Sequence, residues 1–392
     1  VILWTVRILS ALRNLPRVPN LLDPRYARPL TPQITPLISV IVPACNEEAN
    51  IEGTLRSLFA IDSVPIHIFA VDDRSTDSTG AILDRIAAET DRVAGETDSI
   101  AAESQSRLTV IHVTELPTGW LGKPHAMALA ARQATTPWLL FTDADVLFSP
   151  DALLRAINLA HAENADHVVV FPTMILKTFG ERMMIAIFQS FSTLASPPWR
   201  IPDPRSRESI GIGAFNLIRA EAYRAIGGFE SLRMQVTEDI RLGVEIKRAG
   251  YRQRAAFGRG LIRLRWAEGA FHFINNVTKN FFAIFRFRSR PALIGCAVLT
   301  IFCLAPFAGL AGPLRYRIPA ALLYLMLFFL YRRLGRFSKL PAAFFLTFPI
   351  AAALLIYALF RSVVVTLLRG GIRWRGTFYP LAELRKTAGP AR

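Results

Sequence analysis

Short apolar runs alternate with helical stretches from residue 37 onward, and this alternation limits the possible folds more than any other feature of the chain. Leu37–Val42 is apolar and rich in β-branched residues, as expected of a strand buried on both faces. Similar runs are Ile66–Val71, Leu108–Val113, Trp138–Phe141 and His167–Phe171, and helical spacing occurs over Glu47–Phe59, His125–Ala134 and Pro150–Ala162. The alternation predicts a doubly wound α/β fold with a mainly parallel sheet, in which ligands bind beyond the carboxyl ends of the strands.

The C-terminal third of the chain has the composition of a membrane segment. Ala292–Leu310 is long enough to cross about 30 Å of hydrocarbon, and Ile318–Tyr331 and Pro341–Phe360 are also apolar. Acidic residues almost vanish after Arg286 while basic clusters continue, so the net charge of +16 indicates an anionic membrane surface and no nucleic-acid partner. We expect about three transmembrane helices in residues 291–368, and the side of the membrane that holds the basic tail 369–392 stays open.

The other segments complete the predicted domain organisation. Residues 1–36 combine a short apolar stretch, interpreted as an interfacial helix, with a proline-rich linker. Residues 37–267 hold the α/β domain, in which the polar stretch 87–104 predicts a surface extension. Residues 268–290 are amphipathic, aromatic and basic, which is typical of a helix that lies at a membrane interface.

Two polar groups follow the first two predicted strands. Pro43, Asn46 and Glu47 follow the first strand, where a polar turn can face a nucleotide base or ribose, or can simply begin a helix. Asp72 and Asp73 follow the second strand, and a carboxylate there can accept a hydrogen bond from a base N–H or a ribose hydroxyl. Both groups are candidates for nucleotide binding.

A third acidic group follows the fourth strand. Asp143, Ala144 and Asp145 form an Asp-x-Asp sequence, whose two carboxylates can share Mn²⁺ or Mg²⁺ while diphosphate oxygens fill the other positions. Such a metal neutralises charge on a leaving nucleoside diphosphate. Lys123, before the helix at 125–134, reaches either a donor phosphate or only solvent, and His125 is expected on the surface.

A fourth acidic group begins a helix near residue 240. Displacement at an anomeric carbon needs a base that takes the proton of the acceptor hydroxyl. Asp239 is the first candidate for this base and Glu238 the second, although acids in a first helical turn also occur without any catalytic role because they favour the helix dipole. Gly211 and Gly213 predict either tight backbone near a pocket or an ordinary turn, and we place Gly213 in the acceptor region.

Taken in order, these motifs resemble glycosyltransferase family 2. The matching segments are PACNEEANI (43–51), VDDRSTDST (71–79), GKPHAMALA (122–130), TDADV (142–146), GGF (227–229) and TEDIRLG (237–243). The resemblance spans about Leu37 to Trp266 and implies a Rossmann-like GT-A fold, a nucleotide-diphosphate sugar donor expected to be a UDP-sugar, and inversion at the anomeric carbon. It also implies that Asp73 and Asp72 hold the nucleotide base, that Asp143 and Asp145 hold a divalent metal, and that Asp239 is the catalytic base.

One departure from the family pattern concerns the acceptor. Processive members such as cellulose and hyaluronan synthases carry Gln-x-x-Arg-Trp, whereas Ile262 takes the glutamine position here. The run that contains Arg263, Arg265 and Trp266 is more similar to carotenoid- and hopanoid-associated enzymes, and the tail 374–379 is similar to these and to ceramide glucosyltransferases. The resemblance therefore implies a single transfer to a lipid hydroxyl of hopanoid, carotenoid or sphingolipid-like type. It implies a multi-pass protein of a bacterial-type inner membrane with a cytoplasmic catalytic domain.

Three alternative functions stay open. A polysaccharide synthase is expected to carry the missing glutamine. A polyprenyl-phosphate sugar transferase needs cations for the acceptor phosphate, and Arg263, Arg265 and Lys279 are available for that role. A non-catalytic membrane scaffold predicts the loss of at least one acidic group, and all four are intact.

Overall fold

The computed structural model describes residues 2–30, 37–96 and 107–387 and divides into two compact units. The α/β unit comprises Pro19–Thr173 and Ile201–Leu264, and the helical unit comprises Val1–Val18, Met174–Arg200 and Arg265–Arg392. Parts of three predicted segments, namely the linker at 31–36, the polar stretch at 97–106 and the tail at 388–392, lie outside the described residues.

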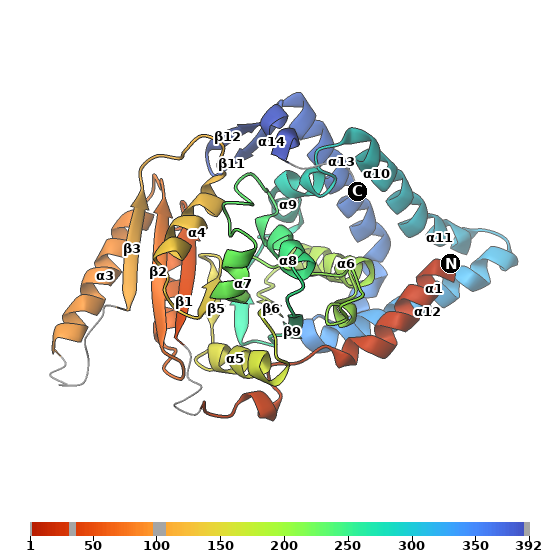
Figure 1. Cartoon of the computed structure of the whole chain (residues 1–392). Helices are drawn as coiled ribbons and strands as arrows, with labels where there is room; N and C mark the ends of the chain where they lie inside the picture. The colour runs from red at the N-terminus through yellow and green to blue at the C-terminus, as the bar shows by residue number, and fades with distance from the viewer. Residues whose placement is uncertain (1, 31–36, 97–106, 388–392) are drawn as a thin grey trace. The chain divides into compact units, whose positions relative to one another are not determined.

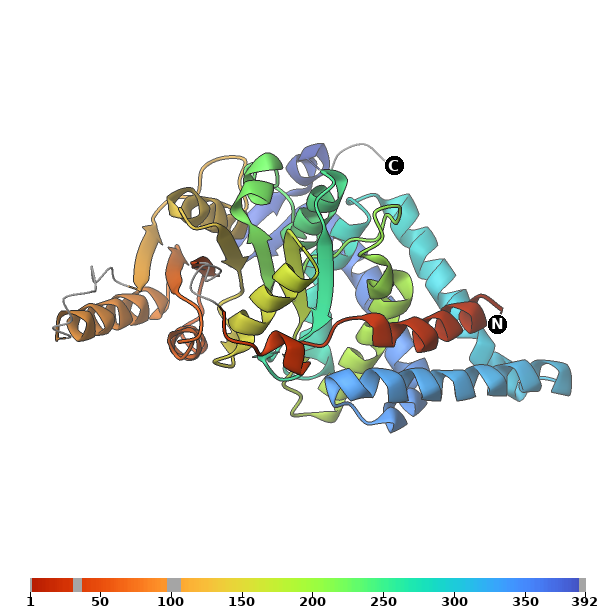
Figure 2. The same ribbon diagram turned by 60° about the horizontal axis from the view of Figure 1, so that its bottom comes forward.

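A seven-stranded sheet forms the centre of the described α/β unit, and its strands can be followed in Figures 1 and 2. The strand order is β3-β2-β1-β4-β8-β6-β9, in which β8 runs antiparallel to both neighbours and the other adjacent pairs are parallel. The bounds are β1 Ile38–Ala44, β2 Ile66–Asp73, β3 Leu108–Val113, β4 Trp138–Phe141, β6 His167–Phe171, β8 Asn216–Arg219 and β9 Gln253–Phe257. The sheet confirms the predicted GT-A type of α/β fold.

Helices surround this sheet, and β5 and β10 belong to a second, separate short sheet. Val146–Phe148 (β5) pairs antiparallel with Ile262–Leu264 (β10). The helices of the unit are α2 Ile51–Phe59, α3 Thr79–Glu96, α4 Gly122–Gln133, α5 Ala152–Ala162, α7 Ala220–Ala225 and α8 Glu238–Arg248. Because β2, β1 and β4 are adjacent and parallel, their carboxyl ends bring the predicted nucleotide and metal residues to one edge of the sheet.

Helix α2 begins four residues later than the sequence spacing predicts. The chain turns at Asn46, whose φ is 55°, and the Asn46 side-chain oxygen accepts a hydrogen bond from the Thr76 amide at 2.8 Å. The Glu47 amide donates to the Thr79 hydroxyl at 2.8 Å. These bonds join the loop after β1 to the loop after β2, and they hold residues 46 and 47 in a turn, so the helix begins after it.

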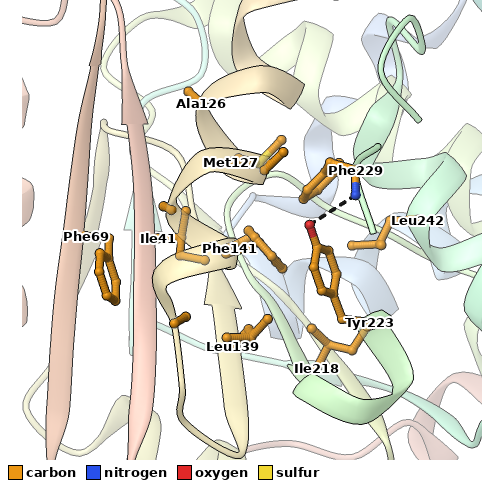
Figure 3. Packing of buried hydrophobic residues seen from close by; sticks show 14 of the residues in the cluster. Ile41, Phe69, Ala126, Met127, Leu139, Phe141, Ile218, Tyr223, Phe229 and Leu242 are labelled. Atoms are coloured by element: carbon orange, nitrogen blue, oxygen red, sulfur yellow. Dashed lines mark hydrogen bonds between the residues drawn. The ribbon is translucent and has the colours of Figure 1, made fainter. Parts of the chain in front are cut away.

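Aromatic and aliphatic side chains fill the core between the sheet and α4 (Figure 3). Phe141 at the end of β4 packs edge-on against Phe229, with ring centroids 4.9 Å apart, and Tyr223 lies 5.2 Å from Phe141. The Tyr223 hydroxyl accepts a hydrogen bond from the Phe229 amide at 3.0 Å. Burying each such ring contributes roughly 1.5–3 kcal/mol, so this cluster holds the loop at 227–229 beside the end of β4.

The helical unit contains three segments that are long and apolar enough to cross a membrane, among the residues described. They are Ser289–Ala311, Leu314–Ser338 and Ala342–Leu368, with mean hydropathies of 2.3, 1.4 and 2.3. The helices of the unit include α1 Ile2–Asn14, α6 Phe179–Ala195, α9 Ala270–Ile284, α10 Ser289–Cys303, α12 Leu314–Ser338 and α13 Phe348–Leu368. The hairpin of β11 (Gly371–Trp374) and β12 (Thr377–Pro380) follows α13, and helix α14 (Leu381–Thr387) follows the hairpin.

Candidate active site

Asp72 and Asp73 leave the carboxyl end of β2 and are held by neighbouring side chains. The Asp73 side chain is only 5% exposed, and Arg74 binds both of its oxygens, with Nε 2.8 Å from Oδ1 and Nη2 3.1 Å from Oδ2. Asp72 accepts a hydrogen bond from the Ser75 amide and lies 3.1 Å from Nδ1 of His112. Sequence reasoning missed Arg74 and His112. The position of His112 at the end of the third predicted strand was the available signal, because that residue pairs with Asp72 across β2 and β3.

Lys123 lies within the carboxylate cluster and not in open solvent. Its Nζ is 2.6 Å from Oδ1 of Asp143 and 2.7 Å from Oε1 of Glu238, and its side chain is 22% exposed. Burial lowers the pKa of Lys123, but the carboxylates of Asp143, Glu238 and Asp239 outweigh burial and hold this pKa well above its usual value. The helix dipole disfavours a cation in the first turn of α4, and the surrounding carboxylates compensate for this effect on Lys123.

Glycines let these groups approach one another closely. A Cβ built on Gly122 would lie 2.1 Å from Oδ2 of Asp73, and one built on Gly213 would lie 2.5 Å from Oδ2 of Asp143. Neither distance is compatible with an unmoved side chain. The predicted tight backbone at 211–213 is therefore present, and it lies beside the predicted metal-binding carboxylate.

The Asp-x-Asp sequence follows β4, where Asp143 and Asp145 share a crowded negative environment. Burial, and then the charges of Asp143 and Glu47, raise the pKa of Asp145 to about 7. Ala144 between them is buried, and its carbonyl accepts a hydrogen bond from the Thr54 hydroxyl at 2.7 Å. This bond fixes the backbone from which the two aspartates extend.

Asp239 lies in the first turn of α8 and faces the glycine loop. Its Oδ2 accepts a hydrogen bond from the Gly213 amide at 2.9 Å, and its Oδ1 accepts one from the Ile240 amide at 2.7 Å. Burial, and then the charge of neighbouring Glu238, raise the pKa of Asp239 to about 7, although Lys123 opposes this rise. A carboxylate with such a pKa can exchange a proton near neutral pH.

Lys123, Gly213, Glu238 and Asp239 line a small pocket in the α/β unit. Lys123, Glu238 and Asp239 supply its charged wall, and Phe141 and Phe229 supply an aromatic one. The pocket thus combines a few convergent polar groups with an apolar lining, which is the usual character of a small-molecule site.

A buried polar network behind this pocket was not predicted from the sequence. His167 on β6 lies between Asn216 on β8, 3.1 Å from its Nε2, and Gln253 on β9, 2.8 Å from its Nδ1. Gln253 also exchanges two hydrogen bonds of 2.8 Å with the backbone of Ile210, and Asn216 donates to the carbonyl of Ile212 at 2.7 Å. The network therefore anchors the loop whose Gly213 amide binds Asp239.

Of the predicted site residues, Lys123, Gly213, Glu238 and Asp239 line this pocket, whereas the others, Asp143 and Asp145 included, are not among its lining residues. Pro43 is a buried residue of β1 that pairs with Val71, and Arg263 is an exposed residue of β10. Arg265 and Trp266 belong to the helical unit, where Arg265 binds buried Glu181 at 2.9 Å. Their predicted role toward the acceptor stays a prediction.

His125 is not on the surface as expected. The residue is 8% exposed in α4, and its Nδ1 has no hydrogen-bond partner among the described residues.

The donor set fits a hard divalent cation that a diphosphate helps to bind. Among the described residues, no group of three or more His, Cys, Asp or Glu side chains forms a metal site. Mg²⁺ and similar ions are often held by one or two carboxylates together with substrate phosphates, and Asp143 and Asp145 supply two. A cation there would relieve the repulsion that raises the pKa of Asp145.

Comparisons with known proteins found the following similarities. The chain is 26% identical over 292 residues to 4,4'-diaponeurosporenoate glycosyltransferase of Staphylococcus haemolyticus, a match that covers 71% of this chain and 70% of the relative. The mannosyltransferase PcManGT of Pyrobaculum calidifontis, solved with GDP-Man and Mn²⁺, is 19% identical with a TM-score of 0.51, and the match covers 93% of this chain and 96% of that one. TarS of S. aureus with UDP-GlcNAc is 18% identical with a TM-score of 0.40, covering 88% and 96%. Residues 39–227 match the family model Glycosyl transferase family 2, and this chain therefore contains a glycosyltransferase domain of that family.

Proposed function

We propose that this protein is an inverting, metal-dependent glycosyltransferase that moves a sugar from a nucleotide-diphosphate sugar, with UDP-sugar as the expected donor, to a hydroxyl of a membrane lipid. The observation that carries the proposal is the pocket in which Lys123 joins Asp143 to Glu238 beside Asp239. One wall can receive a diphosphate, and the other holds a carboxylate that can accept a proton.

In the proposed reaction the acceptor oxygen attacks the anomeric carbon from the face opposite the diphosphate, and the bond from that carbon to the diphosphate oxygen breaks. The carboxylate of Asp239 takes the hydroxyl proton, and the Gly213 amide holds that carboxylate in position. The ammonium group of Lys123 attracts the diphosphate. A divalent metal at Asp143 and Asp145 would supply Lewis-acid stabilisation of the leaving diphosphate.

Nucleotide recognition falls to the edge formed by β1 and β2. Asp73, with Asp72 behind it, is proposed to bind the base, and Asn46 and Glu47 lie on the loop that is joined to Ser75, Thr76 and Thr79 by hydrogen bonds. Arg74 shares the Asp73 carboxylate, so base binding must accommodate this ion pair.

Two observations support a membrane lipid as the acceptor. The relative from Staphylococcus haemolyticus is named for an apolar carotenoid-type acceptor, and this chain carries helices that are long and apolar enough to cross a membrane. The name of that relative denotes a carboxylate, which has no proton to lose at neutral pH, so the need for Asp239 distinguishes a hydroxyl acceptor from a carboxylate acceptor.

The test uses detergent-purified full-length protein with UDP- and GDP-sugars, a lipid extract, and Mn²⁺, Mg²⁺ or EDTA. We expect turnover of one donor that EDTA abolishes and that Asp239→Asn lowers by about 10²–10⁴-fold. Asp91→Asn, the same change on an exposed residue of α3, is the matched control and should keep full activity. The absence of turnover with every donor, metal and lipid would refute the proposal. Activity that survives EDTA would refute the proposed metal dependence.

A further inference from the structure

Helix α13 runs beside α9 within the helical unit, and the two helices point the same way. Near their first residues both approach the first turn of α6: the Phe179 ring is 5.3 Å from that of Phe344, just before α13, and a Cβ on Gly180 would lie 2.9 Å from the amide nitrogen of Ala270 in α9. In the last turn of α9, the Phe282 amide donates at 2.9 Å to the hydroxyl of Ser362, which lies six residues before the end of α13. The two helices therefore run side by side over the length of α9.

The composition of α9 indicates which region of a bilayer this helix contacts. The helix carries His272, Asn275, Asn276, Thr278, Lys279 and Asn280, and Phe271 is 77% exposed on it. A helix with this many polar side chains is not stable in the hydrocarbon core of a bilayer, but it is typical of the headgroup region. Since α13 runs beside α9 over this length, the same region suits α13. Arg361 of α13, which donates to Thr278 of α9, then needs no place in the membrane interior.

The charges that follow α13 point to the same conclusion. Five exposed cations, Arg369, Arg373, Arg375, Arg385 and Lys386, follow it within 18 residues, and Glu383 is the one acid in 269–387. Trp374 stacks under Lys279 of α9 at 3.8 Å, and Arg385 donates to the carbonyl of Phe287 at 3.0 Å. The hairpin and α14 are thus attached to α9, next to exposed apolar residues such as Leu368, which is 82% exposed.

We propose that α13 lies along the membrane interface without crossing it, and that the hairpin β11–β12 with α14 binds anionic phospholipid headgroups of the leaflet that α9 contacts. The cations are opposite in charge to the anionic headgroups of that leaflet. The apolar face of α13 can contact the boundary between its headgroups and acyl chains. This inference does not depend on the proposed glycosyl transfer, because its readouts are sidedness and lipid binding.

The first test measures sidedness in membrane vesicles of both orientations with a membrane-impermeant maleimide. Cys45, Cys296 and Cys303 are replaced by serine, and single cysteines are introduced as Ala382→Cys in α14 and, for reference, Ala60→Cys in the α/β unit; both alanines are exposed. We expect both cysteines to be labelled from the same side. Labelling of Ala382→Cys from the opposite side would show that α13 crosses the membrane and would overturn the proposal.

The second test measures the lipid. Detergent-purified full chain is mixed with phosphatidylglycerol or phosphatidylcholine, and bound lipid is counted by native mass spectrometry. Replacing Arg369, Arg373 and Arg375 by Gln should lower the preference for phosphatidylglycerol about fivefold per cation removed. Replacing Arg28, Arg92 and Arg233, three exposed arginines of the α/β unit, by Gln should leave it unchanged. Equal losses in both triple variants, or none in the tail variant, would overturn the proposed surface.

Discussion

Protonation of His167 should break the hydrogen bonds that anchor the loop at 210–213, whose Gly213 amide binds Asp239. Gln253 Oε1 accepts the Ile210 amide proton, so its Nε2 must be the donor to Nδ1 of His167, and Nε2–H of the ring then donates to Asn216. A second ring proton would place N–H against N–H in a buried site. Burial accordingly lowers the pKa of His167 to about 4.

The size of this effect follows from linkage. In the unfolded chain the ring has a pKa of about 6.5, so unfolding takes up a proton between pH 6.5 and pH 4, and stability is full above that window and lost as the pH falls through it. At pH 5 the loss attributable to His167 is about 2 kcal/mol, compared with about 0.2 kcal/mol at pH 7. For a domain of roughly 200 residues this corresponds to a decrease in Tm of about 4–8 °C.

The assay is thermal unfolding of the full chain in detergent at pH 7 and pH 5, for the wild type and for His167→Gln. The variant should be less stable at pH 7, because its side chain does not fit the network, yet its Tm should fall less than that of the wild type on acidification. His272→Gln, a change of an exposed histidine in the helical unit, should follow the wild type. Parallel decreases for the wild type and His167→Gln would refute the reasoning.

Three further predictions concern the pocket. Lys123→Met should lower kcat/KM by about 10²–10³-fold, and it should also lower Tm because it leaves the buried Glu238 carboxylate without its cation. Steady-state donor kinetics beside thermal unfolding measure both effects, and an unchanged rate in the folded variant would remove Lys123 from diphosphate binding. The rate should fall as the pH drops below about 7, the pKa to which burial raises Asp239, because a base must be deprotonated; a flat kcat/KM profile from pH 5 to 8 would contradict this role. Gly211→Ala should lower the free energy of unfolding by about 1–3 kcal/mol or more, since its Cβ would lie 1.7 Å from the Asp239 carbonyl oxygen. Gly250→Ala has open space but a φ of +85°, and should lower it by about 1 kcal/mol. Comparable Tm values for both variants would show that the close approach at Gly211 is relieved without cost.

Local signals predicted the first half of the fold well. The apolar runs at Leu37–Val42 and Trp138–Phe141 became β1 and β4, because buried parallel strands need continuous apolar sequence. The antiparallel strand β8 escaped prediction, since Asn216–Arg219 is four residues long and carries no alternation. The start of α2 was misplaced because hydrogen bonds to a loop 30 residues away determined it.

The amino-acid sequence by itself determined the α/β class, the acidic groups at strand ends and the apolar C-terminal third. Each of these features depends only on neighbouring residues in the chain, through the period of their side chains and their composition. Only the tertiary structure decided that Lys123 joins Asp143 to Glu238, that the Gly213 amide holds Asp239, and that a His167 network supports them. These contacts join residues from 20 to 115 positions apart. The pKa shifts at the site arise from burial and neighbouring charge, which exist only once the sheet has brought the strand ends together.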